Sequence, residues 1–591
     1  MPGLETGIYA TTKRHHRTLL KKGREKKTYK VTQQTGYANA WLLTQCAAED
    51  KKDQDHEKLQ QTTDLPQAEL ECLNKAYIDL ENLGDRDLVD RFMTRGGNEP
   101  RRMYQADMVN LFCHSAEIQE LQSNSSSISL RKACLVDDRT NNGTVSMGLG
   151  DRKPLTPREM YVKLMEKRFH GLPTTDEPKK LNADRRLVFI TDLDSHALVS
   201  LMATAPTDHT KALTHFFYSY IAFHPYIGVL SKPSGLATFA FSFHLPFYSW
   251  TCAQHEPRDV RLKRDGIPLR KVHDMSFLGG NSQMAAPKVD YLCQVQIAVC
   301  IARTDDKIWT GYCLVDTYCQ PGDQKQRVED YCDSDFQFDP FTDGKHDANL
   351  PILNPGDYFL ASLECQLLVF KNEWMKTAQT FKQKVEAYVD EFKFVHGESG
   401  SLASRDSQQP LVWLRQTRRK LTQLVVCLET TIDCWDNFTY PDRLQTVYGR
   451  QSLVAVRQTF METKNCLKEL YNIRTLCDEH EKALNLHSID EQYRLSRLQA
   501  QVAESTQALS CFLLYVLSPI TLAAAILSMQ EKAIPGFLGP NKLSLFLLAP
   551  MLMLFLFLVS SLVQYWKKIQ LYISHSLSQL SAREGHGIEF V

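Results

Sequence analysis

The sequence predicts an α/β domain, then a helical stalk and, near the C-terminus, two membrane-spanning helices. Apolar residues alternate with polar ones at several places between positions 184 and 350, which is typical of strands. Strand patterns stop near Asp357, and long helical patterns take their place as far as residue 505. Two uncharged runs follow, each long enough to cross a membrane.

The predicted organisation has seven segments. These are 1–183, a partly disordered region with a basic tail; 184–350, a cytosolic α/β domain; 351–505, the helical stalk; 506–530, the first transmembrane helix; 531–542, an outer loop; 543–566, the second transmembrane helix; and 567–591, a cytosolic tail.

The N-terminal region carries a basic run from Lys13 to Lys30, KRHHRTLLKKGREKKTYK. Such a run is typical of a solvated tail, and it also suits attraction to an anionic membrane surface or a targeting role. Polar tracts such as QSNSSSIS and DDRTNNGT then alternate with short helical patterns. We therefore expect partial order before residue 184 and assign no function to this region.

The α/β domain begins with RRLVFITDL, a short apolar strand at Arg185. Helical spacing follows, with Asp194 as the expected N-cap. In TFAFSFHLPFYSW, strict alternation places successive phenylalanines on one face of a strand. Two further apolar runs flank Asp305-Asp306 and predict a β-hairpin. Helical patterns then cover residues 357–394, 411–436 and 442–486, and a last one runs from Ile489 without Pro or Gly into the first uncharged segment.

The membrane segments follow from charge and length. No charged residue occurs in the 26 positions between Glu504 and Glu531 or in the 24 between Lys542 and Lys567. About 20 residues suffice for a helix to cross the hydrocarbon core. Lys and Arg are more frequent on the side that holds both chain ends than in the connecting loop, so we expect both termini in the cytoplasm.

The first span carries a polar stripe that the second lacks. At about 100° per residue, Ser510, Thr521 and Ser528 fall within about 20° of one another, with Gln507 and Ser518 nearby. Polar side chains in a bilayer face protein or water, so several copies around an axis could enclose a pathway. Alternatively, these hydroxyls bond to carbonyls of their own helix.

The end of this span resembles the CorA family of magnesium transporters. The family pattern P-L-T-F-I-x-x-I-Y-G-M-N is matched by Pro519, a helix break, by Ile520-Thr521 and Ile526, and by Ser528-Met529-Gln530 in place of Gly-Met-Asn. The resemblance implies a homopentamer, a pore mouth at Ser528, Met529 and Gln530, and a pore lined by Gln507, Ser510, Leu514, Ser518 and Thr521. It also implies passive transport of Mg²⁺ or a related divalent cation.

The altered triplet keeps a second function open. Gln530 retains an amide but adds a methylene, and Ser528 replaces a glycine. The chain could therefore be a non-conducting CorA-derived protein that is anchored in the membrane and serves interaction or regulation. An enzyme is not expected, because GxxxxGK[ST], HExxH and GxSxG are all absent. No resident cofactor is expected either.

Composition limits which further partners and ligands we expect. Lys plus Arg and Asp plus Glu each number 69, so the formal net charge is zero, which argues against a nucleic-acid partner. The sixteen cysteines form no CxxC pair and are expected to be reduced, mostly buried thiols. Two clusters could hold a metal, although core packing or a solvated loop suits them better: Cys293, Cys300, Cys313, Cys319 and Cys332, and Asp333, Asp335, Asp339 and Asp343.

Overall fold

The computed structural model contains two compact units, one that ends at Glu479 and one that begins at His480. It describes residues 74–76, 87–94, 99–123, 130–140, 152–169, 182–231, 239–279, 288–303, 308–321, 327–332, 337–350, 352–397, 409–438, 450–528 and 542–584. The predicted basic tail, outer loop and end of the C-terminal tail lie outside these residues, as do Asp333, Asp335, Met529 and Gln530.

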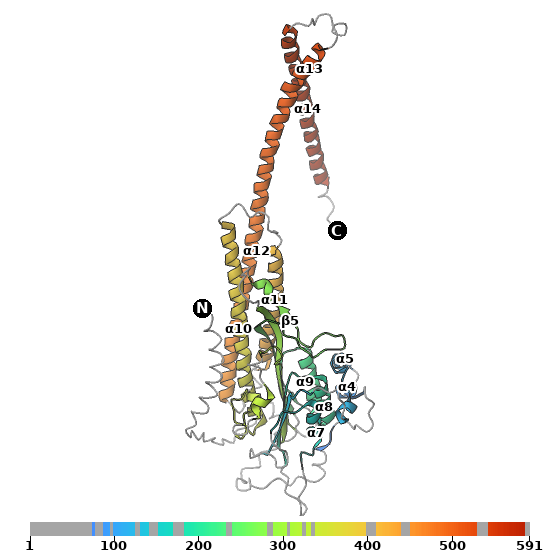
Figure 1. Ribbon diagram of the computed structural model, residues 1–591, viewed down its shortest axis with the longest axis vertical. Helices are drawn as coiled ribbons and strands as arrows, with labels where there is room; N and C mark the ends of the chain where they lie inside the picture. The colour runs from blue at the N-terminus through green and yellow to red at the C-terminus, as the bar shows by residue number, and fades with distance from the viewer. Residues whose placement is uncertain are drawn as a thin grey trace, which may run out of the picture. The chain divides into compact units, whose positions relative to one another are not determined.

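A mixed seven-stranded sheet forms the centre of the first unit (Figure 1). Along the main path the order is β1-β2-β7-β6-β4-β3, and the short β5 pairs with β6. Among the described strands, β2 and β7 pair in parallel, and the other pairs are antiparallel. The strands are β1 Cys134–Arg139, β2 Arg185–Thr191, β3 Tyr226–Ser231, β4 Phe239–Ala253, β5 Val272–Asp274, β6 Val289–Arg303 and β7 Trp309–Val315.

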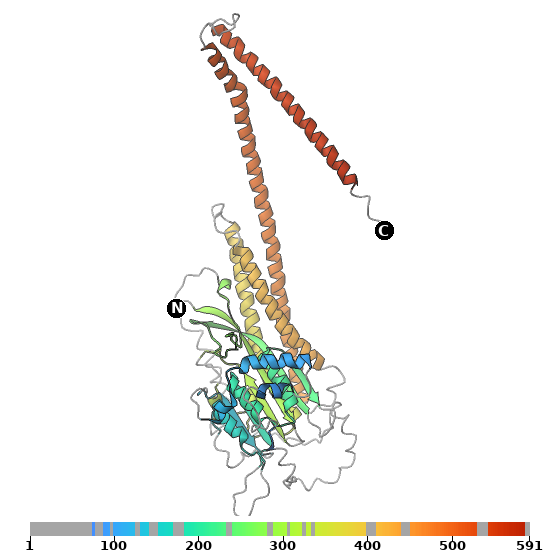
Figure 2. The ribbon, with the colours of Figure 1, turned by 90° about the vertical axis from the view of Figure 1, so that its right-hand side faces the viewer.

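Helices cover both faces of this sheet (Figures 1 and 2). Because side chains alternate along a strand, Phe241 and Phe243 enter one core while Ala240 enters the other. The first core holds side chains of α10 Pro355–Gly397, α11 Gln409–Phe438 and the first part of α12 Arg450–Phe512. The second core involves α4 Asp87–Met93, α5 Pro100–Cys113, α6 Ile118–Gln122, α7 Pro157–Met165, α8 Ser195–Thr204 and α9 Thr210–Ile221.

Several local predictions are confirmed. The Asp194 carboxylate accepts a hydrogen bond of 2.8 Å from the backbone N–H of Ala197 and caps α8. The two apolar runs around Asp305-Asp306 are β6 and β7, which pair antiparallel. The predicted stalk helices correspond to α10, α11 and α12.

The sheet domain begins earlier than the predicted boundary at residue 184. Strand β1 and helices α4 to α7 precede that boundary, and β1 pairs with β2 along its whole length. Its sequence CLVDDR looks like a polar loop, yet Asp137 and Asp138 are buried. Arg139 lies 2.9 Å from Asp137, and Arg186 lies 2.7 Å from Asp138. Ion pairing therefore lets acidic side chains occupy a buried strand.

The second unit contains the two apolar helical segments. They lie within Gln451–Ile526 and Phe546–Gln570, and each is long and apolar enough to cross a membrane. The first continues α12 through a π-helical turn, η5 Leu513–Leu517, into α13 Ser518–Leu527. The second is α14 Lys542–Glu584, which extends as one helix beyond the predicted end of the span at residue 566.

Candidate functional site

The C-terminal helices pack through small residues. Helix α13 and the preceding turn η5 contact α14, and Ala523 of α13 and Ala549 of α14 are buried. Pro519 is buried as well, and the rings of Tyr515 and Phe557 meet at 6.2 Å. Small side chains allow helices to approach closely in a membrane, where lipid offers no hydrophobic drive for association. Pro519 and Ala523 thus mark the side of the first span that faces α14.

Proline explains the π-helical turn before α13. Pro519 has no N–H, so it cannot donate to the carbonyl of Tyr515 four residues earlier. Instead of an α-helical bond, the N–H of Ser518 donates to the carbonyl of Leu513, five residues back. The chain therefore keeps its helical direction with one widened turn. At Pro519, where the sequence predicts a helix break, the helix continues and only the turn before the proline is widened.

The widened turn changes which residues share a face. A π turn absorbs about one residue of rotation, or roughly 100°, relative to an uninterrupted α-helix. Thr521 and Ser528 both follow the turn and stay aligned within about 20°. Ser510 precedes the turn, so it moves from about 20° to about 80° away from Thr521. The predicted alignment of Ser510 with Thr521 and Ser528 is wrong for this reason.

The exposed side of the first span lies opposite α14. Thr521 and Ser528 are exposed, and a helical wheel places them about 140–180° from Pro519 and Ala523. The predicted lining residues before Thr521 are exposed too, namely Gln507, Ser510, Leu514 and Ser518. Of the predicted pore mouth, only Ser528 is described.

Two hydroxyls on this side bond to their own helix. Thr521 donates to the carbonyl of Ser518 at 2.9 Å, and Ser528 donates to the carbonyl of Ala525 at 2.8 Å. Ser528 also has right-handed backbone angles, φ −84° and ψ −8°. A serine therefore fits this helix end without the left-handed conformation that favours glycine. The hydroxyl oxygens keep lone pairs for a further partner.

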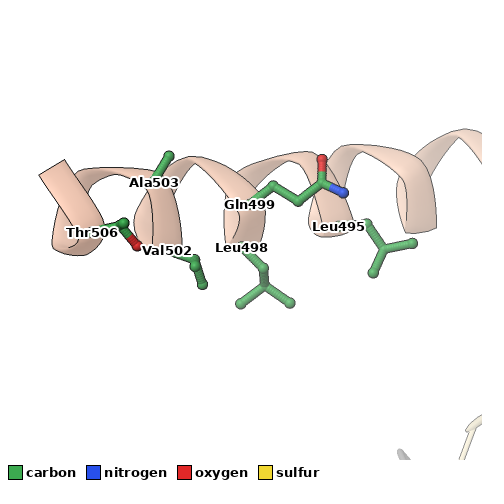
Figure 3. A pocket seen from close by; sticks show the side chains of 6 residues that line it. All are labelled: Leu495, Leu498, Gln499, Val502, Ala503 and Thr506. Carbon is green, nitrogen blue, oxygen red and sulfur yellow. The ribbon is translucent and has the colours of Figure 1, made fainter.

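Sequence reasoning missed an apolar stripe on the second-unit part of α12. An open groove at this stripe is lined by Leu495, Leu498, Val502 and Ala503, together with the polar Gln499 and Thr506. In Figure 3 the side chains of Leu495, Leu498 and Val502 point to the same side of the helix. Leu495, Val502 and Leu509 are exposed and recur every seven residues, the spacing of a coiled-coil seam.

The π turn brings this stripe into line with the polar residues of α13. On an uninterrupted helix, Val502 would lie about 100° from Thr521. With one residue of rotation absorbed, Val502 lies in line with Thr521, and Leu509 lies about 20° away. Two features of the sequence could have revealed this alignment. One is the seven-residue spacing, and the other is Pro519, which disturbs the hydrogen bonding of the helix before it.

Within the first unit, several described members of the two suggested metal clusters have structural roles. Cys293, Cys300, Cys313 and Cys319 are buried, while Cys332 is partly buried. Asp339 is buried, accepts hydrogen bonds from the hydroxyl of Tyr358, and caps a short helix. Within the described parts of the chain, no group of three His, Cys, Asp or Glu side chains could hold a metal ion.

A buried ionic cluster joins the loops that follow β2 and β7. Asp316 lies 2.7 Å from both Arg261 and Arg270, and Asp259 lies 2.7 Å from Arg261. Asp192 follows β2 at a positive φ of 49° and accepts a hydrogen bond from the N–H of Thr317. The nearby guanidinium groups lower the pKa of Asp316 to about 2 although burial opposes this. This cluster fixes the ends of the parallel strands.

No protein-family model and no curated protein matches the chain. Among solved structures, one match is described as "structure of the full-length CmaX protein". The two share 13% sequence identity over 74% of this chain and 97% of that chain, with a TM-score of 0.30. A likeness this distant supports no statement about function or assembly.

Proposed function

We propose that this protein is a CorA-like transporter that passively conducts Mg²⁺ or a related divalent cation through a pore made of several copies. The observation that supports it is the exposed side of the first span, where Thr521 and Ser528 lie opposite the side packed on α14. Polar groups at membrane depth normally face protein or water. The second helix cannot supply that partner, because it occupies the other side.

Further copies of the chain are the natural partner for this face. Leu495, Val502 and Leu509 present a coiled-coil spacing on the same side of the helix as Thr521. Association along this stripe would bring several first spans around one axis, and closed rings are the common outcome of such contacts. The resemblance to CorA implies five copies. Mass measurement in nanodiscs tests assembly, and a stable monomer would exclude the pore.

The proposed pathway ends at Ser528, Met529 and Gln530, with Thr521 and Ser518 along its wall. Mg²⁺ gives up its hydration water reluctantly, and neutral oxygens accept hydrogen bonds from that water without the strong attraction of carboxylates. A ring of Gln530 amides would suit a hydrated ion. In this proposal both termini are cytoplasmic, which labelling of Gly536→Cys from outside only and of Gly585→Cys from inside only would establish.

The deciding experiment is Mg²⁺ flux into liposomes under an imposed potential. We expect wild type to conduct, Gln530→Ala to be silent with assembly intact, and the double variant Ser528→Gly with Gln530→Asn to conduct at least as well as wild type. Silence of all three in verified oligomers would exclude the shared pore.

A non-conducting membrane anchor is the second candidate. Two observations favour it: Thr521 and Ser528 already bond to carbonyls of their own helix, and the family triplet is altered. Hydroxyls that are bonded in this way can face lipid at little cost. In the flux experiment, a silent wild type beside a conducting double variant would identify a pore that has lost its filter, and this second candidate would then hold.

A further inference from the structure

Four basic side chains gather where α11 passes β5 in the first unit. His273 lies in the strand and Lys271 directly precedes it, while Arg419 and Lys420 come from the helix. The strand is held in place because the side-chain oxygen of Gln294 accepts a hydrogen bond of 3.0 Å from the N–H of Lys271. Helix α11 contacts the short helix Ser276–Leu278 that follows β5 directly. Lys271 and Arg419 are exposed, while Lys420 and His273 are half-buried.

These side chains lie close enough to repel one another. The pKa of His273 falls to about 4 because of partial burial and the positive charges of Lys420, Lys271 and Arg419. Burial, Arg419 and Lys271 likewise lower the pKa of Lys420. No carboxylate is among the causes of either shift. The cluster is therefore a concentrated positive charge that an anion would relieve.

Several cations elsewhere in the helical layer differ from these in having a carboxylate partner. In the described part of the chain, Lys271, Arg419 and Lys420 form no ion pair with a carboxylate. By contrast, lysines and an arginine elsewhere on α10, α11 and α12 are paired: Lys371 with Glu462 at 2.7 Å, Lys382 with Glu469 at 2.9 Å, Lys384 with Asp290 at 2.8 Å, Lys464 with Asp436 at 2.8 Å, and Arg418 with Asp478.

The neighbouring groups leave the positive charge uncompensated. Asp274, next to His273 on the strand, accepts a hydrogen bond of 2.7 Å from the N–H of Ser276 and acts on the pKa of Tyr291 instead. On the other side, the ring of Tyr248 stacks on His273 at 6.4 Å. The pKa of this phenol is raised to about 12, so Tyr248 is neutral.

We propose that Lys271, His273, Arg419 and Lys420 form a binding site for a phosphate group, carried by a soluble metabolite or by a lipid headgroup. Phosphate suits the arrangement because it accepts several hydrogen bonds and carries more than one negative charge. The guanidinium of Arg419 can bind two of its oxygens, and the two ammonium groups add charge from separate elements. The site is independent of ion conduction.

The test uses the full chain in phosphatidylcholine nanodiscs and two probes. Inorganic pyrophosphate, measured by calorimetry, represents the soluble source. Co-flotation with phosphatidylcholine vesicles, with and without a minor fraction of phosphoinositide, represents the headgroup. Binding of pyrophosphate alone identifies a soluble ligand, and binding only of phosphoinositide vesicles identifies a lipid. If neither binds, the proposal is overturned.

Substitutions distinguish binding at this site from binding to surface charge in general. Lys271→Gln with Lys420→Gln should weaken binding by about tenfold or more, since two charge-assisted hydrogen bonds are lost. The matched control is Arg415→Gln, an exposed residue one turn earlier on α11 that is not among the causes of the His273 shift. An equal loss in the control, or no loss in the double variant, would refute the site.

The pH dependence of anion binding tests the part played by His273, because a histidine with a purely structural role would not alter it. The free histidine is neutral near pH 7 because its pKa is about 4. A bound anion raises that pKa, so binding takes up a proton and tightens as pH falls. Affinity for sulfate, whose charge stays constant, should rise several-fold between about pH 7.5 and 5.5 in wild type and stay flat in His273→Gln. A flat wild-type profile contradicts the proposed geometry.

Discussion

Replacing Pro519 tests whether the π turn sets the register of the first span. The Pro519→Ala variant regains the N–H that could donate to the carbonyl of Tyr515. The obstacle to a continuous α-helix is then gone, and a π turn is rarely retained without a cause. We therefore expect η5 to become α-helical in the variant, with α12 and α13 rotated relative to each other.

The size of this rotation follows from the spacing. At about 100° per residue, Leu509 lies about 120° and Ser510 about 20° from Thr521 on an uninterrupted helix. With the π turn, Leu509 lies about 20° and Ser510 about 80° from Thr521. Leu509 should therefore share a face with Thr521 in wild type, and Ser510 should replace it in the variant.

Disulfide cross-linking between copies measures this exchange. In a chain whose exposed Cys252 and Cys511 are replaced by serine, we expect Leu509→Cys and Thr521→Cys each to form cross-linked dimers. Ser510→Cys should react poorly. In the Pro519→Ala background, only one of Leu509→Cys and Thr521→Cys should still react, because these two positions then no longer share a face.

A second proline provides the control. Pro550→Ala lies in α14, outside the π turn, and should leave the cross-linking pattern unchanged. The reasoning fails if wild type cross-links at Ser510 and Thr521 while Leu509 is silent.

Three further predictions concern the first unit, and unfolding of the full chain measures each. Asp316→Asn should lower the free energy of unfolding by about 3–5 kcal/mol, because buried arginines lose a carboxylate. The control Asp436→Asn, in an exposed ion pair, should cost under about 1 kcal/mol, and similar losses in the two would refute the distinction. Because the pKa of Asp316 falls from 3.8 to about 2, it contributes about 2 kcal/mol that is present above pH 4 and lost as pH falls toward 2. In Asp316→Asn this acid-dependent part should be missing. Gly311→Ala should cost about 1–3 kcal/mol, because the new methyl carbon would lie 2.8 Å from the ring of Phe341 and 3.0 Å from Leu187. An unchanged midpoint would show that these side chains move aside.

The elements that could be predicted from the sequence are those with local signals. The N-cap at Asp194 needs only its own residue and the next three, and the β6–β7 hairpin needs only two apolar runs and a polar break. Strand β1 could not be predicted in this way. Its acidic residues become acceptable only through arginines such as Arg186, 48 residues away in the sequence, so no local pattern reveals the strand.

The same distinction between local and long-range signals applies to the candidate site. Helix length and the proline could be predicted, whereas the face that each residue occupies could not. A helical wheel assumes one angle per residue, and the π turn at Leu513–Leu517 breaks that assumption. The ionic cluster around Asp316 was also missed, because its arginines come from a loop more than forty residues before it.

The order of elements along the chain has a consequence for synthesis. Strand β2 pairs in parallel with β7, so the centre of the sheet cannot close until Val315 has left the ribosome. The first apolar segment follows only after α10, α11 and most of α12. At about 5–20 residues per second, this gap gives the sheet roughly 10–40 s before the segment emerges. The sheet domain therefore has time to fold before the first apolar segment emerges from the ribosome.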